Sequence, residues 1–379
     1  MRDGVARIGY VHAVCRIAVA SDASSPINQT VMTRKDANFT SDAEMFELFD
    51  RFIRDAGGDP KKLDGKLIRE MLHTTIKLMR DGADTGELKL VSRSLKELRY
   101  AMRVFRDYRD VPKVTIFGSA RTPADDPEYQ AALDFGKVMA QRGWMIITGA
   151  GGGIMEAGHG GAGREASFGV AIRLPFETTA NEFIEGDEKL IVFRYFFTRK
   201  LMFVSQSHAV VLFPGGFGTQ DECYETLTLI QTGKTPVVPV VMVDAPGQSY
   251  WEYWDRNVRK DLLGKGMIDE SDLNLYMVTD DVQAAVDHIV NFYRNYHSQR
   301  FVGDDLVIRM RESLAESHVD ALNEEFADLI VQGRLEPCEA LKGEHEHLDL
   351  PRIRFTYTRR DYGRLRLMID RINAFAAGK

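Results

Sequence analysis

The segment Pro214–Glu222 (PGGFGTQDE) combines residue types that can hold an anion with one that can act on it. It follows an apolar run typical of a buried strand and begins a stretch with helical spacing. The amides of Gly216, Gly218 and Thr219 would point at a bound anion, and the helix dipole would reinforce the attraction. Glu222 lies one turn into the helix, where a carboxylate repels a phosphate unless it has a chemical task. The alternative is that Glu222 only complements the helix dipole.

Two other glycine-rich segments follow predicted strands. Gly149–Gly153 has four glycines in five residues, which costs backbone entropy but lets a phosphate or sugar lie against bare amides at a helix start. Its spacing does not match the Walker phosphate loop, and it resembles the dinucleotide fingerprint only loosely. The pair Gly118-Ser119 follows the first strand, where a ligand-binding loop and an ordinary strand-to-helix turn explain it equally well.

Two adjacent cations, Arg199 and Lys200, begin the predicted helix that precedes the strand before Pro214. Arginine offers a two-pronged donor to phosphate oxygens or ribose hydroxyls. Both cations could therefore reach the rim of a pocket formed by the glycine-rich loops. From spacing alone, a solvated Arg-Lys pair is the commoner explanation.

The elements that would position these loops alternate between strand and helix from residue 112 to residue 297. Strands separated by helices of this length indicate βαβ crossovers and a parallel, doubly wound sheet. The predicted fold class is therefore α/β, and ligands bind such sheets at the carboxyl ends of their strands, where the three loops fall. The predicted strands are 114–117, 145–148, 168–172, 190–193, 208–213, 237–243 and 276–279.

The flanking regions show other patterns. Residues 1–40 lack periodicity and are expected to form a disordered leader, with Met32 as an alternative start. Residues 41–111 are expected to form a helical N-terminal segment, and residues 298–379 a small α+β C-terminal extension. The N-terminal helices are predicted near 41–57, 64–80 and 92–106. The extension is predicted to contain a helix near 304–332, a polar loop at 336–348, a strand at 353–358 and a helix at 362–376.

Bulk composition narrows the functional class. The formal net charge of −7 argues against an electrostatic groove for nucleic acid. The three cysteines are far apart and odd in number, which favours a reducing compartment over a disulfide framework or a zinc cluster. No apolar run reaches the roughly 18–20 residues that cross a bilayer. We therefore expect a soluble, cytoplasmic protein with no nucleic-acid or membrane partner.

Together, the chemistry-bearing residues resemble the LONELY GUY (LOG) family of cytokinin riboside 5′-monophosphate phosphoribohydrolases and the related bacterial nucleotide 5′-monophosphate nucleosidases. The family pattern PGGxGTxxE is matched in full at Pro214–Glu222. The Arg-Lys motif of the family is matched at Arg199-Lys200, and its GGG-x-M loop at Gly151–Met155. The resemblance covers residues 112–297.

The resemblance implies a Rossmann-like doubly wound sheet that forms a homodimer or a higher homo-oligomer, with active sites at or near the subunit interface. It also implies that Arg199 and Glu222 form a catalytic pair. This pair would act on a nucleoside 5′-monophosphate, hydrolysing the N-glycosidic bond to give free base and ribose 5-phosphate. The implied substrate-binding residues are Gly118, Ser119, Gly151, Gly152, Gly153, Met155, Lys200, Gly215, Gly216, Gly218 and Thr219. No metal or cofactor is expected, because His345 and His347 fit a solvated polar turn better than a metal site.

Parts of the chain depart from the family pattern. Phe196-Phe197-Thr198 replaces the usual residues before the Arg-Lys motif, and Ala120-Arg121 replaces a second serine in the first loop. The flanking segments are absent from the short plant-type enzymes. These departures favour AMP or a similar nucleotide over a cytokinin-like substrate. The label "lysine decarboxylase", which some family members carry, gains no support, because no lysine lies in a recognisable setting for pyridoxal phosphate.

Two other functions fit the same fold. A non-catalytic carrier of a nucleotide or of molybdenum cofactor would keep the glycine-rich loops but lose the catalytic pair. A nucleotide-sensing regulatory protein would use the flanking segments to report ligand occupancy. Retention of both Arg199 and Glu222 favours the enzyme.

Overall fold

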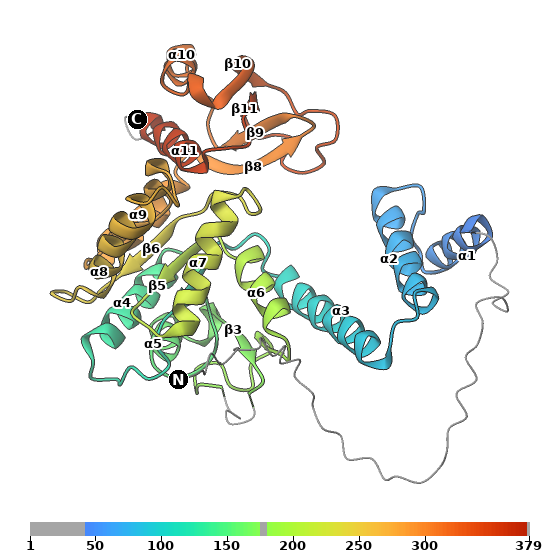
Figure 1. Cartoon of the computed structure of the whole chain (residues 1–379), viewed down its shortest axis with the longest axis horizontal. Helices are drawn as coiled ribbons and strands as arrows, with labels where there is room; N and C mark the ends of the chain where they lie inside the picture. The colour runs from blue at the N-terminus through green and yellow to red at the C-terminus, as the bar shows by residue number, and fades with distance from the viewer. Residues whose placement is uncertain (1–41, 175–179, 377–379) are drawn as a thin grey trace, which may run out of the picture. The chain divides into compact units, whose positions relative to one another are not determined.

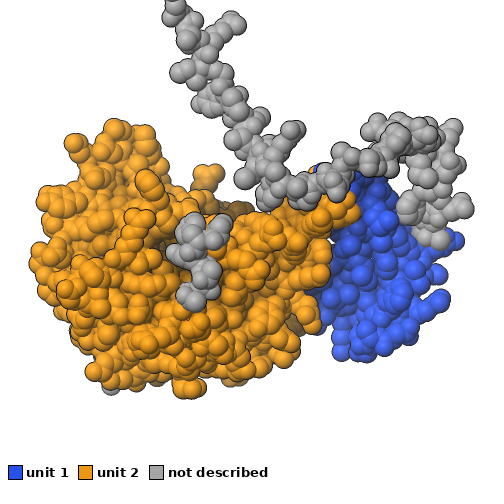
Figure 2. Space-filling view, turned by 90° about the horizontal axis from the view of Figure 1, so that it is seen from below, with its two compact units in different colours: residues 1–84 blue, residues 85–379 orange. Residues whose placement is uncertain are grey.

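A computed structural model describes residues 42–174 and 180–376 of the chain (Figure 1). The predicted leader, residues 1–40, lies outside the described residues. The chain divides into two compact units, residues 1–84 and residues 85–379 (Figure 2). In the described part of the chain, no helix is both long and apolar enough to cross a membrane.

The first unit contains two of the predicted helices, α1 (Asp42–Asp55) and α2 (Leu63–Arg80). In α1 the apolar residues Met45, Phe49 and Ile53 recur every four positions, so they share one face of the helix. This face is buried, and α1 packs on α2. The amphipathic spacing in the sequence therefore indicated both helices correctly.

The second unit is built around a sheet of seven parallel strands, counted among the described residues, in the order β4-β3-β2-β1-β5-β6-β7. The chain adds strands outward from β1 to β4 and then returns to the other side of β1 with β5. This reversal creates a switch point between β1 and β5, which is where open α/β sheets bind ligands. The predicted α/β class is confirmed. The strands are β1 (Lys113–Phe117), β2 (Met145–Thr148), β3 (Ser167–Ile172), β4 (Leu190–Phe193), β5 (Ala209–Leu212), β6 (Val240–Val243) and β7 (Met277–Thr279).

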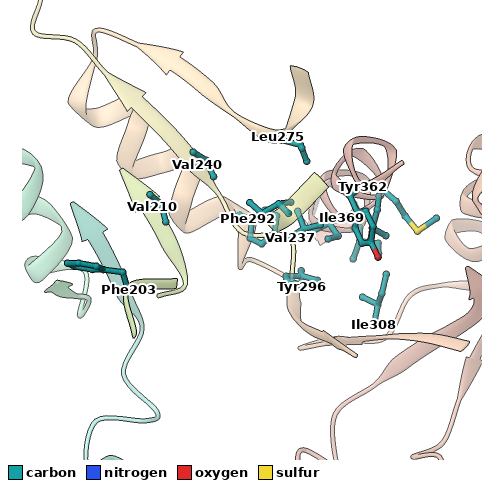
Figure 3. Packing of buried hydrophobic residues seen from close by; sticks show 14 of the residues in the cluster. Phe203, Val210, Val237, Val240, Leu275, Phe292, Tyr296, Ile308, Tyr362 and Ile369 are labelled. Carbon is teal, nitrogen blue, oxygen red and sulfur yellow. The ribbon is translucent and has the colours of Figure 1, made fainter. Parts of the chain in front are cut away.

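Helices cover both faces of this sheet, because successive residues of a strand point to opposite sides. Val114 and Ile116 of β1 pack in a core with α4, α5 and α9, whereas Phe117 packs in a second core with α3, α6, α7 and α8. The second core continues from Phe203 to Ile369, which lies in the C-terminal extension (Figure 3). The helices are α3 (Thr85–Arg106), α4 (Pro127–Gln141), α5 (Ile154–Ala162), α6 (Phe196–Ser205), α7 (Phe217–Gln231), α8 (Tyr250–Asn257) and α9 (Val282–Phe292).

The C-terminal extension is an antiparallel sheet, in the order β10-β11-β9-β8, with two helices. The strand and the last helix match the predicted ranges, but the single helix predicted near 304–332 is wrong. Gly303, at φ 65°, turns the chain into a hairpin, and the alternating residues of β9 then pair with β8. The extension contains β8 (Tyr296–Val302), β9 (Asp305–Met310), α10 (Glu316–Glu325), β10 (Ile330–Cys338), β11 (Arg352–Tyr357) and α11 (Tyr362–Ala376).

One residue of the predicted polar loop at 336–348 is buried. The Glu344 carboxylate lies 2.6 Å from Arg309 Nη2 and 2.9 Å from Arg352 Nη1, and it also accepts a hydrogen bond from the Leu341 amide. The side chains of Glu344, Arg309 and Arg352 are 0%, 5% and 1% exposed. Glu344 therefore neutralises two buried guanidinium groups of the C-terminal sheet, whereas its neighbours His345, Glu346 and His347 are exposed.

Replacing Glu344 with Gln should destabilise the protein by about 3–5 kcal/mol, because it leaves two buried guanidinium groups without a counter-charge. The matched control is Glu346→Gln, an exposed neighbour in the same turn, which should change the free energy of unfolding by less than about 0.5 kcal/mol. Urea unfolding at neutral pH measures both changes. Equal stability of the two variants would contradict the structural role of Glu344.

Candidate active site

The three glycine-rich loops lie at the carboxyl ends of β2, β1 and β5, which are neighbours in the sheet. Backbone hydrogen bonds join them. The Ser119 amide donates to the Pro214 carbonyl, and the Ile154 amide donates to the Ser119 carbonyl, each at 3.0 Å. The Ser119 hydroxyl accepts from the Arg121 amide at 3.1 Å, as in an ordinary strand-to-helix turn. The first loop is thus the link between the other two.

Close packing explains some of the glycines but not all of them. A Cβ at Gly118 would lie 2.5 Å from the Ile154 side chain, and a Cβ at Gly153 or Gly215 would overlap neighbouring atoms of the loops. By contrast, a Cβ at Gly216 or Gly218 would meet no described atom within 4 Å. Packing within the protein therefore does not require these two glycines, and they leave the start of α7 open to a ligand. Gly216 is the N-cap of α7 and has no side chain to cap the helix amides.

Two buried polar residues that the sequence reasoning missed position the second loop. The side-chain nitrogen of Asn181 donates a hydrogen bond to the Gly151 carbonyl at 2.9 Å. The backbone N–H of Asn181 donates to the Ala150 carbonyl. His159 contacts Asn181 and also lies 3.1 Å from the Thr148 hydroxyl, which accepts a hydrogen bond from the Ala150 amide. These contacts hold Ala150 at φ 63°, a conformation that non-glycine residues rarely adopt. The available signal was a histidine among the small residues of α5, between Gly158 and Gly160.

A cleft of about 990 Å³ opens beside these loops. It contains some of the predicted residues, namely Gly151, Met155, Arg199 and Gly218. The other predicted residues do not line the cleft; they are Gly118, Ser119, Gly152, Gly153, Lys200, Gly215, Gly216, Thr219 and Glu222. Two further cations, Arg173 and Arg194, also line the cleft and were not predicted. Both follow the ends of strands, β3 and β4, which was the signal that could have found them.

Arg199 is held at the cleft by its own helix and by β3. Its Nε donates to the Val170 carbonyl at 3.0 Å, and its guanidinium lies 5.1 Å from the centre of the Phe203 ring. The start of α6 is fixed by Glu97 of α3, which accepts hydrogen bonds from the Arg194 amide and the Thr198 hydroxyl. Thr198, one of the departures from the family pattern, therefore has a positioning role in this chain.

Lys200 faces α7 rather than the cleft. Its Nζ lies 2.9 Å from Asp221, 3.4 Å from Glu222 and 2.7 Å from Glu225. Burial lowers the pKa of Lys200, but the hydrogen bonds to Glu225 and Asp221 outweigh it and raise the pKa above the usual value. Lys200 therefore stays charged beside Glu222, and its contact with a substrate anion stays a prediction.

Glu222 is a buried carboxyl with a pKa near neutrality. It is 8% exposed, and burial raises its pKa to about 7, although Lys200 and Arg199 act in the opposite direction. A group with this pKa exchanges a proton readily at neutral pH, which is the property required of a general acid or base. Within the described residues, no three His, Cys, Asp or Glu side chains are arranged to hold a metal ion.

Comparison with known proteins shows what part of this chain is similar to. Residues 151–289 match a family model described as "Possible lysine decarboxylase". A cytokinin riboside 5′-monophosphate phosphoribohydrolase from Mycobacterium tuberculosis is 29% identical over 171 residues, which are 44% of this chain and 88% of that protein. The resemblance to the LOG family is confirmed. The stretch matched by the family model includes Gly151–Gly153 of the second loop, the third loop, Arg199 and Glu222. We call residues 112–297 the LOG-like domain.

Solved structures are also similar to part of this chain. The molybdenum cofactor carrier protein of Chlamydomonas reinhardtii has a TM-score of 0.34 and 23% identity, with coverage of 48% of this chain and 98% of that chain. The molybdenum cofactor binding protein of Rippkaea orientalis has a TM-score of 0.33 and 19% identity, with coverage of 48% and 96%.

Replacing Glu222 with Gln should stabilise the protein above pH 7. The folded-state pKa of about 7 exceeds the ordinary value of 4.5, so the wild type loses stability as the pH rises through this range. Glutamine removes this cost, which we expect to be on the order of 1–3 kcal/mol at pH 8.5 and close to zero at pH 4.5. Urea unfolding at several pH values measures the difference. The control Asp221→Asn, whose side chain is 63% exposed, should show no comparable gain. A pH-independent effect of Glu222→Gln would refute the buried, raised pKa.

Proposed function

We propose that this chain hydrolyses the N-glycosidic bond of a nucleoside 5′-monophosphate, AMP or a similar nucleotide, to free base and ribose 5-phosphate. The main support for this proposal is the position of Glu222. This buried carboxyl has a pKa near 7 and lies one turn from the open, glycine-rich start of α7. The relative named as a phosphoribohydrolase supports the same reaction class.

The start of α7 supplies the site for the phosphate. The amides that follow Gly216 have no side-chain cap, so they and the helix dipole attract an anion. The open space at Gly216 and Gly218 lets phosphate oxygens approach the backbone. Binding energy from the phosphate, which does not react, then aligns the sugar with Glu222 and Arg199.

The chemical step follows from the charges around the sugar. The bond between C1′ and the base nitrogen breaks, its electron pair leaves with the base, and positive charge develops on the ribose as in other glycoside hydrolyses. Ionised Glu222 stabilises this charge and takes a proton from the water whose oxygen bonds to C1′. The departing base takes up a proton, and Glu222 returns its own to solvent. Arg199, anchored to Val170, binds the sugar-phosphate.

The charge state of Lys200 argues against the decarboxylase activity suggested by the family description. A lysine that forms a Schiff base needs a depressed pKa so that its amine is uncharged. Three carboxylates of α7 surround the Lys200 ammonium and raise its pKa instead. Lys200 therefore fits an electrostatic partner of Glu222 better than a pyridoxal phosphate ligand.

A cytoplasmic setting belongs to the same proposal. Cys223 and Cys338, the two described cysteines, are both free thiols, and Cys223 is buried. Thiols of this kind are compatible with a reducing compartment.

Replacing Glu222 with Gln should lower kcat by about 10²–10⁴-fold and leave nucleotide affinity unchanged or improved, because the variant lacks the base and the repulsion of phosphate. Base release from a panel of nucleoside 5′-monophosphates, with adenosine as the uncharged comparison, is the measurement. Asp221→Asn is the control, and it should keep most of the activity. Arg199→Ala should weaken binding as well as rate.

Two outcomes would count against this proposal. If Glu222→Gln keeps more than about a tenth of the wild-type rate, a change of under about 1.4 kcal/mol, Glu222 is not the catalytic carboxyl. If the wild type binds nucleotide tightly and releases no base from any member of the panel, the chain is a carrier or a sensor.

We further propose that the second unit forms a homodimer through α6 and the start of α7. Lys200 of α6 forms ion pairs with Asp221 and Glu225 of α7, and both helices expose large apolar side chains. Phe217 is 97% exposed, and Phe196, Phe197 and Leu201 are each at least half exposed. We infer that these side chains form one apolar surface, and such a surface is typical of a subunit interface.

Replacing Leu201 with Asp should convert the protein to a monomer, because the charge would be buried at this interface. Leu348→Asp, at an equally exposed leucine of the C-terminal extension, should leave the oligomer intact. Light scattering at micromolar concentration distinguishes the two results. A wild type that is a monodisperse monomer would contradict the proposal.

A further inference from the structure

A second large cavity lies at the amino ends of the parallel strands, whereas the cleft lies at their carboxyl ends. It has a volume of about 900 Å³. Its walls include Pro112, Trp144, His208 and Pro236, which precede or begin the amino ends of β1, β2, β5 and β6. The opposite wall is formed by the start of β8 and by residues 346–347 of the C-terminal extension. We call this space the distal cavity, because the cleft opens at the carboxyl ends of the same strands.

The inner wall of the distal cavity is aromatic and apolar. Trp144 is 6% exposed and lies 5.9 Å from the Tyr293 ring and 6.3 Å from the His208 ring, measured between centroids. Val237 and Pro236 continue this surface. His208 Nδ1 accepts a hydrogen bond from the Lys113 amide at 3.2 Å, so the neutral ring carries its proton on Nε2. The wall can therefore hold a flat ring and offer it a hydrogen-bond donor.

The rim of the distal cavity carries charges of both signs. Arg311 is anchored by Nε, which donates to the Tyr293 carbonyl at 3.0 Å. The Arg109 guanidinium makes no hydrogen bond or ion pair within the described residues, although it lines the cavity. Asp110 and Glu346, both exposed, lie on the same rim. Two guanidinium groups fit an anion, and the two carboxylates fit a ligand that also has hydroxyl or amino donors.

We propose that the distal cavity is a second binding site, separate from the cleft, for a ligand of mononucleotide size that joins a flat heteroaromatic ring to an anionic group and hydroxyl donors. The volume lies within the range of small-molecule sites, and such sites are common between packed domains. The ring lies against the aromatic wall, and the anion lies between Arg109 and Arg311. Because both the parallel sheet and the C-terminal extension supply walls, the ligand links the two.

The histidines of the distal cavity suit an uncharged hydrogen-bonding role. Burial lowers the pKa of His208 to about 4, helped by Lys113 and His297. Burial also lowers the pKa of His297 to about 4, helped by His347 and two arginines. The rings of His297 and His347 are 4.5 Å apart. At neutral pH His208 and His297 are therefore neutral, and the positive charge available to an anion comes from Arg109 and Arg311.

The test counts binding sites with formycin 5′-monophosphate, a nucleotide analogue whose base is joined to C1′ by a carbon–carbon bond and so cannot be hydrolysed. Isothermal titration calorimetry is performed on the full chain and on Arg109→Met. The matched control is Arg106→Met, an exposed arginine three residues away that does not line the cavity. We expect two molecules per chain for the wild type and the control. In Arg109→Met the affinity of one site should fall by about tenfold or more.

The results separate this proposal from the proposed function. If the cleft binds no nucleotide, the wild type binds one molecule, and Arg109→Met still weakens it while Arg106→Met does not. In that case the distal site stands and the nucleosidase proposal fails. Filling the cavity with Val238→Trp, checked for folding by circular dichroism, should abolish the same site. Binding that is identical in the wild type, Arg109→Met and folded Val238→Trp would overturn the distal site.

Discussion

The candidate site depends on how closely three backbone loops approach one another at the switch point of the sheet. The Ser119 amide and carbonyl bond to Pro214 and Ile154, so the first loop fixes the distance between the other two. Side chains at Gly118, Gly153 or Gly215 would force the loops apart. Since this contact also sets where α7 begins, it decides where Glu222 lies. The proposed phosphate site and the Glu222 carboxyl are therefore brought together by packing among glycines rather than by contacts between polar side chains.

The charge balance at α7 follows from that placement. Burial alone would raise the free energy of ionised Glu222, and a phosphate bound nearby would raise it further. Lys200, at 3.4 Å, offsets part of this cost, but it is shared with Asp221 and Glu225, which lie closer to it. The compensation is thus incomplete, and the pKa of Glu222 settles near 7 instead of at an ordinary carboxyl value. A stronger, unshared ion pair would stabilise the fold but would keep Glu222 ionised and unable to retain a proton.

Local patterns in the sequence were enough to predict the sheet, its helices and the loops at the switch point. In each case the signal lay within a few residues, as in the apolar run and glycines around Pro214. Arg173, Arg194 and Asn181 were missed because their roles depend on which strand ends become neighbours. The hairpin of β8 and β9 was missed because its alternating run is short and is followed at once by the helical pattern of α10. The burial of Glu344 depends on Arg309 and Arg352, which come from different strands. It therefore could not be predicted from the residues next to Glu344 in the sequence.

The C-terminal extension packs directly against backbone atoms of the LOG-like domain. The Tyr362 ring of α11 packs against Gly233, at φ 67°, so closely that a Cβ would overlap it, and Gly363 packs in the same way against the Ser271 carbonyl. Asn373 of α11 accepts hydrogen bonds from the amides of Asn295 and Tyr296 and so fixes the start of β8. The extension is therefore part of the same packed core as the parallel sheet. It lies at the amino ends of the parallel strands, whereas the cleft opens at their carboxyl ends. The phosphoribohydrolase relative, 88% of which aligns with only 44% of this chain, leaves little length to match this extension. That relative therefore gives little information about the function of the C-terminal extension.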